Sequence, residues 1–165
     1  MQRKLLVASI EAACALGVSA YFWQNKAQAP ATTFVLLDAS QKHSTDFLGK
    51  VTLVNFWATS CTTCVAEMPQ MVATFNQYQA KGYRTVAVAM QYDLPAYVIN
   101  FAQTRQLPFD VAIDNTGAIA RAWGDVQLTP TSYVVNKKGF IVKRYVGQPD
   151  FAELHALIEK LLNES

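Results

Sequence analysis

Two cysteines separated by two residues, Cys61 and Cys64, are the side chains of this sequence best suited to covalent chemistry. A cysteine thiolate attacks a disulfide sulfur, and a second thiol within reach can resolve the mixed disulfide that forms. The residues before the pair, 51–57, are β-branched and aromatic, so they predict a strand buried on both faces. After the pair, apolar residues recur at three- and four-residue spacing from Val65 to Phe75, which predicts an amphipathic helix.

The cysteine pair is therefore expected where a strand ends and a helix begins. Unpaired N–H groups and the helix dipole favour an anion at that position, so the pKa of the Cys61 thiol should be lowered. Cys64 lies one helical turn further along, within reach of a disulfide with Cys61. We predict that Cys61 is the nucleophile and Cys64 the resolving thiol of a redox couple.

A structural role is the alternative for this pair, either as a stabilising disulfide or as half of a zinc site. A zinc site with four ligands needs further donors. The remaining cysteine, Cys14, lies in an apolar N-terminal run, and His43 and His155 are isolated in the sequence. A disulfide that closes so short a loop also adds little stability, because the stabilisation grows with loop length. The redox role is favoured, without a metal ion or a cofactor.

The composition is typical of one globular domain with an N-terminal appendage: 165 residues, of which 52% are hydrophobic. The net charge of +2 comes from residues 1–29, where basic side chains outnumber acidic ones. The rest of the chain is neutral and has no basic cluster, which argues against a nucleic acid as a partner.

The start of the chain predicts a membrane anchor. Arg3 and Lys4 precede an apolar run, 5–23, that contains a single charged residue, Glu11. At ~1.5 Å per residue this run spans about 28 Å, close to the thickness of the hydrocarbon core of a bilayer. Basic residues before such a run predict that the N-terminus stays in the cytoplasm.

The alternative to an anchor is a signal peptide, because residues 27–29 (AQA) match a signal-peptidase pattern. Pro30 follows directly and should hinder cleavage, so we favour an uncleaved anchor over residues 1–23. The small and polar residues 24–33 then form a linker, and residues 34–165 form the catalytic domain.

Apolar periodicity and turn residues divide the rest of the chain into alternating strands and helices. Strand–helix–strand units followed by a hairpin and a terminal helix predict an α/β fold with a mixed central β-sheet flanked by helices. Strands are expected at 34–38, 42–45, 51–57, 85–90, 111–113, 129–136 and 140–146. Helices are expected after Cys61, from Asp93, at 118–123 and from Phe151 to Leu162.

Four short motifs, taken in order, resemble the thioredoxin superfamily, and within it the membrane-anchored TlpA/ResA branch of bacterial thiol-disulfide oxidoreductases. The resemblance runs from about Phe34 to the C-terminus and implies a thioredoxin-like fold. Residues 90–117 resemble the strand-and-helix insertion that sets this branch apart. The motifs are Asn55-Phe56-Trp57-Ala58, the CTTC segment 61–64, Glu67-Met68-Pro69 and Thr129-Pro130-Thr131.

The resemblance implies that the catalytic domain faces the periplasm or the cell exterior and acts on protein thiols and disulfides. Several members of the branch keep substrate cysteines reduced for cytochrome c maturation or for the assembly of oxidase copper sites. The expected partners are protein substrates, a membrane electron-relay protein as reductant, and the bacterial inner membrane, held through residues 5–23. The resemblance favours a reductant, although Thr62 and Thr63 between the cysteines do not fix the redox potential.

The resemblance also assigns roles to single residues. It implies that Cys61 attacks the substrate and that Cys64 is the buried resolving thiol. Pro130 resembles the cis-proline that faces the active-site disulfide, and the backbone of Thr129 before it would pair with a substrate. Glu67 resembles an acidic residue that takes or gives the proton of the resolving thiol.

Two positions depart from the pattern of these relatives. Many relatives carry tryptophan directly before the first cysteine, where this chain has Ser60, and the smaller residue opens the surface around the nucleophile. Plain thioredoxins carry a buried aspartate where this chain has Asn55, so proton handling falls to Glu67 or to water. We expect a substrate to contact Ser60 and Trp57 as well as the cis-proline segment.

Three other functions stay open for this sequence. A peroxiredoxin-like peroxidase has the same fold; Thr59 is present, but the proline expected upstream of a peroxidatic cysteine is absent. A Cu(I)-binding metallochaperone is a further alternative because thiolates are soft ligands, although its usual relatives space the cysteines further apart and add a histidine. A tethered interaction domain would need neither cysteine.

Overall fold

The computed structural model describes residues 27–164. The expected anchor at 1–23 lies outside the described residues, as do residues 24–26 of the expected linker. Within the described part of the chain, no helix is both long enough and apolar enough to cross a bilayer.

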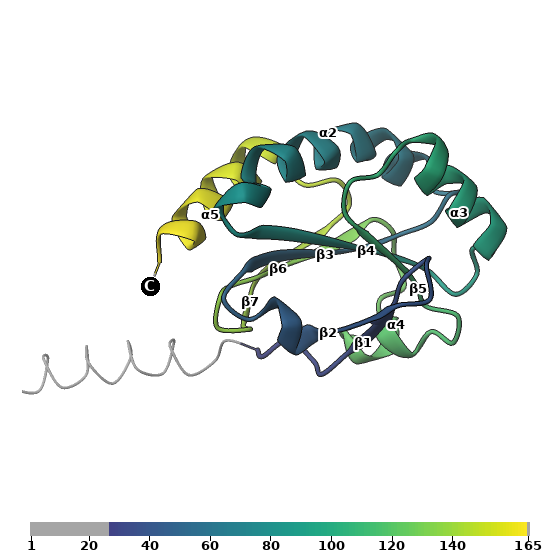
Figure 1. Ribbon diagram of the computed structural model, residues 1–165, viewed down its shortest axis with the longest axis horizontal. Helices are drawn as coiled ribbons and strands as arrows, with labels where there is room; N and C mark the ends of the chain where they lie inside the picture. The colour runs from purple at the N-terminus through teal and green to yellow at the C-terminus, as the bar shows by residue number, and fades with distance from the viewer. Residues whose placement is uncertain (1–26, 165) are drawn as a thin grey trace, which may run out of the picture.

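A five-stranded mixed sheet forms the centre of the domain, as the sequence predicted (Figure 1). The three strands β3, β4 and β5 are parallel, whereas β6 runs antiparallel to both β3 and β7. The terminal hairpin is thus attached to the parallel part of the sheet through β3. In sheet order the strands are β5 (Asp110–Ile113), β4 (Tyr83–Ala89), β3 (Val51–Trp57), β6 (Thr131–Val135) and β7 (Ile141–Val146).

Helices cover one face of this sheet, and a helix with a small second sheet covers the other (Figure 1). The first face carries α2 (Thr62–Tyr78), α3 (Pro95–Thr104) and α5 (Phe151–Asn163). The second face carries α4 (Ala118–Ala122) and the pair β1 (Thr33–Val35) and β2 (Gln41–His43), with short 3-10 turns at Ser44–Phe47 and Gln79–Lys81 elsewhere. The expected helices and strands are therefore present, in the order the sequence predicted.

Strand β3 anchors the cysteine motif in the core of the domain, because all seven of its residues are buried. Alternate side chains point to opposite faces of a strand. Leu53 and Trp57 belong to the hydrophobic cluster that includes α2 and α5, whereas Val54 and Phe56 belong to the cluster on the α4 face. By the same alternation Asn55 faces α2. The cysteine motif follows directly on the end of this central strand.

The described residues before Phe34, 27–33, are part of the folded domain. Ala29 donates its N–H to the carbonyl of Gly139 at 2.8 Å, and Ile141 donates to the carbonyl of Ala27 at 2.8 Å. Residues 27–29 therefore lie along the start of β7, and Thr33 already belongs to β1.

The expected edge strand at 42–45 is shorter in the structure and belongs to the small β1–β2 sheet. Strand β2 ends at His43 because the side chain of Asp46 accepts the N–H of His43 at 2.7 Å and a 3-10 turn begins. Side chains such as aspartate offer the backbone this alternative to a strand ladder.

The predicted insertion, 90–117, consists of α3 and β5. It adds β5 as an edge strand beside β4. Helix α3 packs near the active site, where the ring centroids of Phe101 and Trp57 lie 5.1 Å apart. The loop that leads from β4 into α3, residues 90–94, also reaches the turn before the cysteines.

Candidate active site

Cys61 and Cys64 form a disulfide at the start of α2, as the sequence predicted. Cys61 is the residue before the first helical residue, and its Sγ accepts the backbone N–H of Cys64 at 3.2 Å. The helix N-terminus thus offers a donor to the sulfur that would carry a negative charge as a thiolate.

The two sulfur atoms differ in their access to solvent. Cys61 is partly exposed, whereas Cys64 is 0% exposed. An incoming thiol can therefore reach Cys61 but not Cys64. This asymmetry fits the predicted roles of attacking and resolving thiol.

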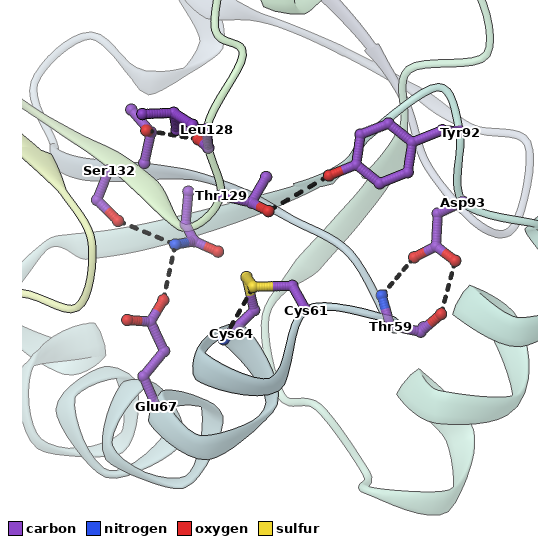
Figure 2. The surroundings of a disulfide bond; sticks show 11 residues. Thr59, Cys61, Cys64, Glu67, Tyr92, Asp93, Leu128, Thr129 and Ser132 are labelled. Atoms are coloured by element: carbon purple, nitrogen blue, oxygen red, sulfur yellow. Dashed lines mark hydrogen bonds between the residues drawn. A yellow bond between two sulfur atoms is a disulfide. The ribbon is translucent and has the colours of Figure 1, made fainter.

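The peptide bond between Thr129 and Pro130 is cis, as expected. Figure 2 shows Thr129 near the disulfide, on the opposite side from Glu67. Pro130 accepts the N–H of Gly147 through its carbonyl, but within residues 27–164 the backbone N–H and C=O of Thr129 have no backbone partner. The main chain of Thr129 is therefore available to pair with an extended substrate segment.

Glu67 lies on α2 one helical turn after Cys64, and its side chain is 0% exposed. Its Oε1 accepts a hydrogen bond from Nδ2 of Asn55 at 3.1 Å, and its Oε2 has no partner among the described residues. Burial raises the pKa of Glu67 from 4.5 to about 7, and the hydrogen bond from Asn55 opposes only part of this rise. A carboxyl that titrates near neutral pH can accept and release protons during exchange.

Asn55 connects Glu67 to the neighbouring strand. Its Nδ2 donates one hydrogen to Glu67 and the other to Oγ of Ser132 at 2.9 Å. The two strands place Asn55 and Ser132 opposite each other in register. Sequence reasoning missed Ser132 because this contact depends on how β3 pairs with β6.

Asp93 is the second residue of the site that the sequence did not reveal. It was expected to begin a helix, but α3 begins at Pro95 after Leu94, and no side chain caps it. The carboxylate of Asp93 instead accepts the backbone N–H of Thr59 at 2.5 Å and the hydroxyl of Thr59 at 2.6 Å (Figure 2). The turn that carries the cysteines is thus attached to the insertion.

The two further residues expected to contact a substrate lie in different environments. Ser60 is exposed and directly precedes Cys61, so it lies on the surface that a substrate would reach. Trp57 is 0% exposed and packs against Phe101. In this conformation Trp57 lies beneath the site and does not reach its surface.

The described residues contain no cluster of three or more histidine, cysteine, aspartate or glutamate side chains that could hold a metal ion. His43 is bonded to Thr33, and His155 to Thr74 on α2. What the site does contain is a disulfide with one accessible sulfur, a buried partner sulfur and a buried carboxyl. This arrangement can exchange a disulfide with other thiols.

The comparisons with known proteins agree with this chemistry. A family model described as Redoxin matches residues 24–158. A thiol-disulfide oxidoreductase ResA from Bacillus thuringiensis subsp. konkukian is 34% identical over 134 residues, which cover 79% of this chain and 76% of the relative. The protein of the same description from Bacillus subtilis is 32% identical over 127 residues, which cover 76% of this chain and 70% of the relative.

Solved structures show the same likeness. A candidate thioredoxin from Neisseria meningitidis aligns with a TM-score of 0.79 and 39% identity over 84% of this chain and 93% of the other. A thiol:disulfide interchange protein from Chlorobium tepidum aligns with a TM-score of 0.77 and 26% identity over 84% of this chain and 98% of the other.

Proposed function

This chain belongs to the redoxin family and is a ResA/TlpA-like thiol-disulfide oxidoreductase of the thioredoxin superfamily, and we propose that it works as a membrane-tethered disulfide reductase outside the bacterial cytoplasm. The observation that carries the exchange chemistry is the position of Glu67, and the resemblance to the ResA/TlpA branch supports the reductive direction. In the reductive direction the buried Cys64 must lose a proton before it can attack, and a buried carboxyl with a pKa of about 7 lies one helical turn away.

The reaction transfers two electrons by two displacements, as in thiol–disulfide exchange generally. The Cys61 thiolate attacks one sulfur of the substrate disulfide, and the other substrate sulfur leaves as a thiolate. Cys64 gives its proton to Glu67 and attacks the Sγ of Cys61. The Cys61–Cys64 disulfide forms and the second substrate sulfur leaves as a thiolate. One substrate thiolate takes the proton that Glu67 holds, and the other takes a proton from water.

The oxidised enzyme then needs two electrons from outside. We assign this role to a membrane electron-relay protein, because residues 5–23 are long and apolar enough to hold the domain at a bilayer. The substrates are disulfides of folded or folding proteins, and those of cytochrome c maturation or of oxidase copper-site assembly are the first to examine.

The tether and the compartment are tested with the full chain expressed in a bacterium that has a periplasm. The proposal expects the protein in alkali-washed membranes, and expects a membrane-impermeant maleimide to label Cys61 in spheroplasts after reduction. Recovery in the soluble periplasm would contradict the tether, and protection from the maleimide would contradict the compartment. A Cys61 thiol that is oxidised at steady state in growing cells would contradict the reductive direction.

A further inference from the structure

One short loop of the insertion contacts both walls of the active site. The loop consists of residues 90–94, between β4 and α3. Asp93 binds Thr59 on the cysteine side, and the hydroxyl of Tyr92 lies 3.3 Å from Oγ1 of Thr129 on the cis-proline side (Figure 2). The two contacts differ in burial, since Asp93 is 6% exposed and Tyr92 is 56% exposed.

The contact between Asp93 and Thr59 is part of a closed set of hydrogen bonds. The N–H of Met90 donates to the carbonyl of Trp57 at 3.0 Å, and the N–H of Asp93 donates to the carbonyl of Met90 at 2.9 Å. Both oxygens of Asp93 then accept hydrogens from Thr59, two residues after Trp57. The end of β3 and the turn after it are therefore held from one side by this loop.

The turn that is held in this way carries the nucleophile. Thr59 lies two residues before Cys61, and the N–H of Cys61 donates to the carbonyl of Ala58 at 3.1 Å. The two bonds that the Asp93 carboxylate accepts are partly buried. Hydrogen bonds to a carboxylate are about twice as strong as bonds between neutral groups. A turn fixed so firmly keeps the Cys61 sulfur beside the N–H of Cys64.

We propose that Asp93 is a positioning residue for thiol–disulfide exchange: through Thr59 it fixes the turn that holds the Cys61 sulfur at the helix N-terminus. This role concerns the exchange activity itself and does not depend on the membrane tether or on the direction of electron flow. It also predicts the direction in which the pKa of the Cys61 thiol changes when the contact is lost. Loosening the turn moves the sulfur away from the helix N-terminus, so the pKa of the Cys61 thiol rises and its attack slows.

A direct electrostatic effect of Asp93 would give the opposite result. If the carboxylate acted only through its charge, its removal would favour the Cys61 thiolate and lower the pKa of the thiol. Thr59 separates the two explanations, because Thr59→Val removes the hydroxyl bond and leaves the charge of Asp93 in place. Thr59→Ser keeps the hydroxyl and serves as the conservative rescue.

The experiment uses the full chain in detergent micelles with Cys14→Ala, which removes the third thiol. The variants are D93N, T59V, T59S and the double variant D93N/T59V, with D38N as a control that removes an exposed carboxylate in the β1–β2 turn. The Cys61 thiolate is titrated by its ultraviolet absorbance, and the reduced enzyme is mixed with the small disulfide dithiobis(nitrobenzoate). The rate constant is divided by the measured thiolate fraction.

We expect D93N to lower this rate constant about tenfold, in line with the cost of a small misplacement of a reacting group. T59V should lower it by less and should raise the pKa of the Cys61 thiol by about half a unit. The double variant should be no slower than D93N, because both changes remove the same contact. T59S and D38N should match the parent protein.

Three results would overturn the proposal: an unchanged rate constant in D93N, effects of D93N and T59V that multiply in the double variant, or a pKa of Cys61 that T59V leaves unchanged. If D93N does not fold, the comparison of T59V with T59S still tests the proposal. T59V should lower the rate constant and raise the pKa of the Cys61 thiol, and T59S should change neither.

Discussion

Asn55 donates a hydrogen bond to Oε1 of Glu67 at 3.1 Å, and this is the one hydrogen bond that the Glu67 carboxyl makes within residues 27–164. A carboxyl with no exposed surface and a single neutral donor is poorly stabilised as an anion. The pair therefore explains why Glu67 holds its proton up to about neutral pH. It also supplies the first three predictions.

The pH dependence of stability should change when Glu67 is replaced by glutamine. The pKa of Glu67 is about 7 in the folded protein and 4.5 as a reference, so folding favours the protonated form. The stabilisation from this group is complete below pH 4.5 and is lost as the pH rises through 7. Relative to Glu67→Gln, the wild-type protein should lose on the order of 2–3 kcal/mol of unfolding free energy between pH 5 and 8.

This measurement is made by urea unfolding of both proteins in the disulfide form, where the cysteines do not titrate. The other acidic residues are common to both proteins, so their contributions cancel in the difference. A difference in unfolding free energy that stays constant from pH 5 to 8 would contradict the account of Glu67.

Replacing Asn55 by leucine should raise the pKa of Glu67 further, because the hydrogen bond from Asn55 favours the anion. At pH 8 the loss of this bond to a charged group should cost about 1.5–3 kcal/mol of unfolding free energy. At pH 5, where Glu67 is protonated, the cost should be smaller. Ser132→Ala is the matched control, since it removes the other partner of Asn55 and its effect should not vary with pH. If Asn55→Leu lowers the unfolding free energy by the same amount at pH 5 and pH 8, this prediction is contradicted.

Glu67→Gln should slow the second displacement, in which Cys64 attacks the mixed disulfide. Loss of a general base costs about 10²–10⁴-fold, and the defect should shrink at high pH, where Cys64 ionises without help. Stopped-flow release of a small thiol from a mixed disulfide at Cys61 measures this step. An unchanged titration of Cys64 together with an unchanged exchange rate would remove Glu67 from the mechanism.

The two cysteines should differ in their reactions with other molecules because only Cys61 is exposed. In the reduced protein with Cys14→Ala, iodoacetamide should modify Cys61 at least about tenfold faster than Cys64, which is shielded from solvent. Cys64→Ser should accumulate mixed disulfides with substrates, whereas Cys61→Ser should not. Peptide mapping of the alkylated protein and non-reducing gels check the two parts, and equal labelling of the two thiols would contradict the assigned roles.

The sequence predicted the part of the site that is local in the chain. Strand β3 and helix α2 follow from apolar periodicity, and the cysteines at their junction follow from spacing. The cis bond before Pro130 was expected from the resemblance to the thioredoxin superfamily and is present. The strand, the helix and the spacing of the cysteines depend on neighbours in the chain, so a single sequence contains that information.

The contacts that tune and hold the site could not be predicted in the same way. Asn55 and Ser132 are 77 residues apart in the chain, and Thr59 and Asp93 are 34 apart. The first contact depends on the register between β3 and β6, and the second on the path of a loop. Neither the strand register nor the path of the loop leaves a periodic signal in the sequence. An aspartate shortly before a proline is typical of a helix start, so the sequence did not indicate that Asp93 binds Thr59.

The midpoint potential of the Cys61–Cys64 couple tests the proposed direction of electron flow most directly. It is measured with the full chain, carrying Cys14→Ala, in detergent micelles equilibrated against glutathione and dithiothreitol buffers. A reductase should give a value below roughly −220 mV, toward the thioredoxin end of the scale. A value near about −120 mV, at the oxidant end, would contradict the reductive role and make the same site an oxidant of protein thiols.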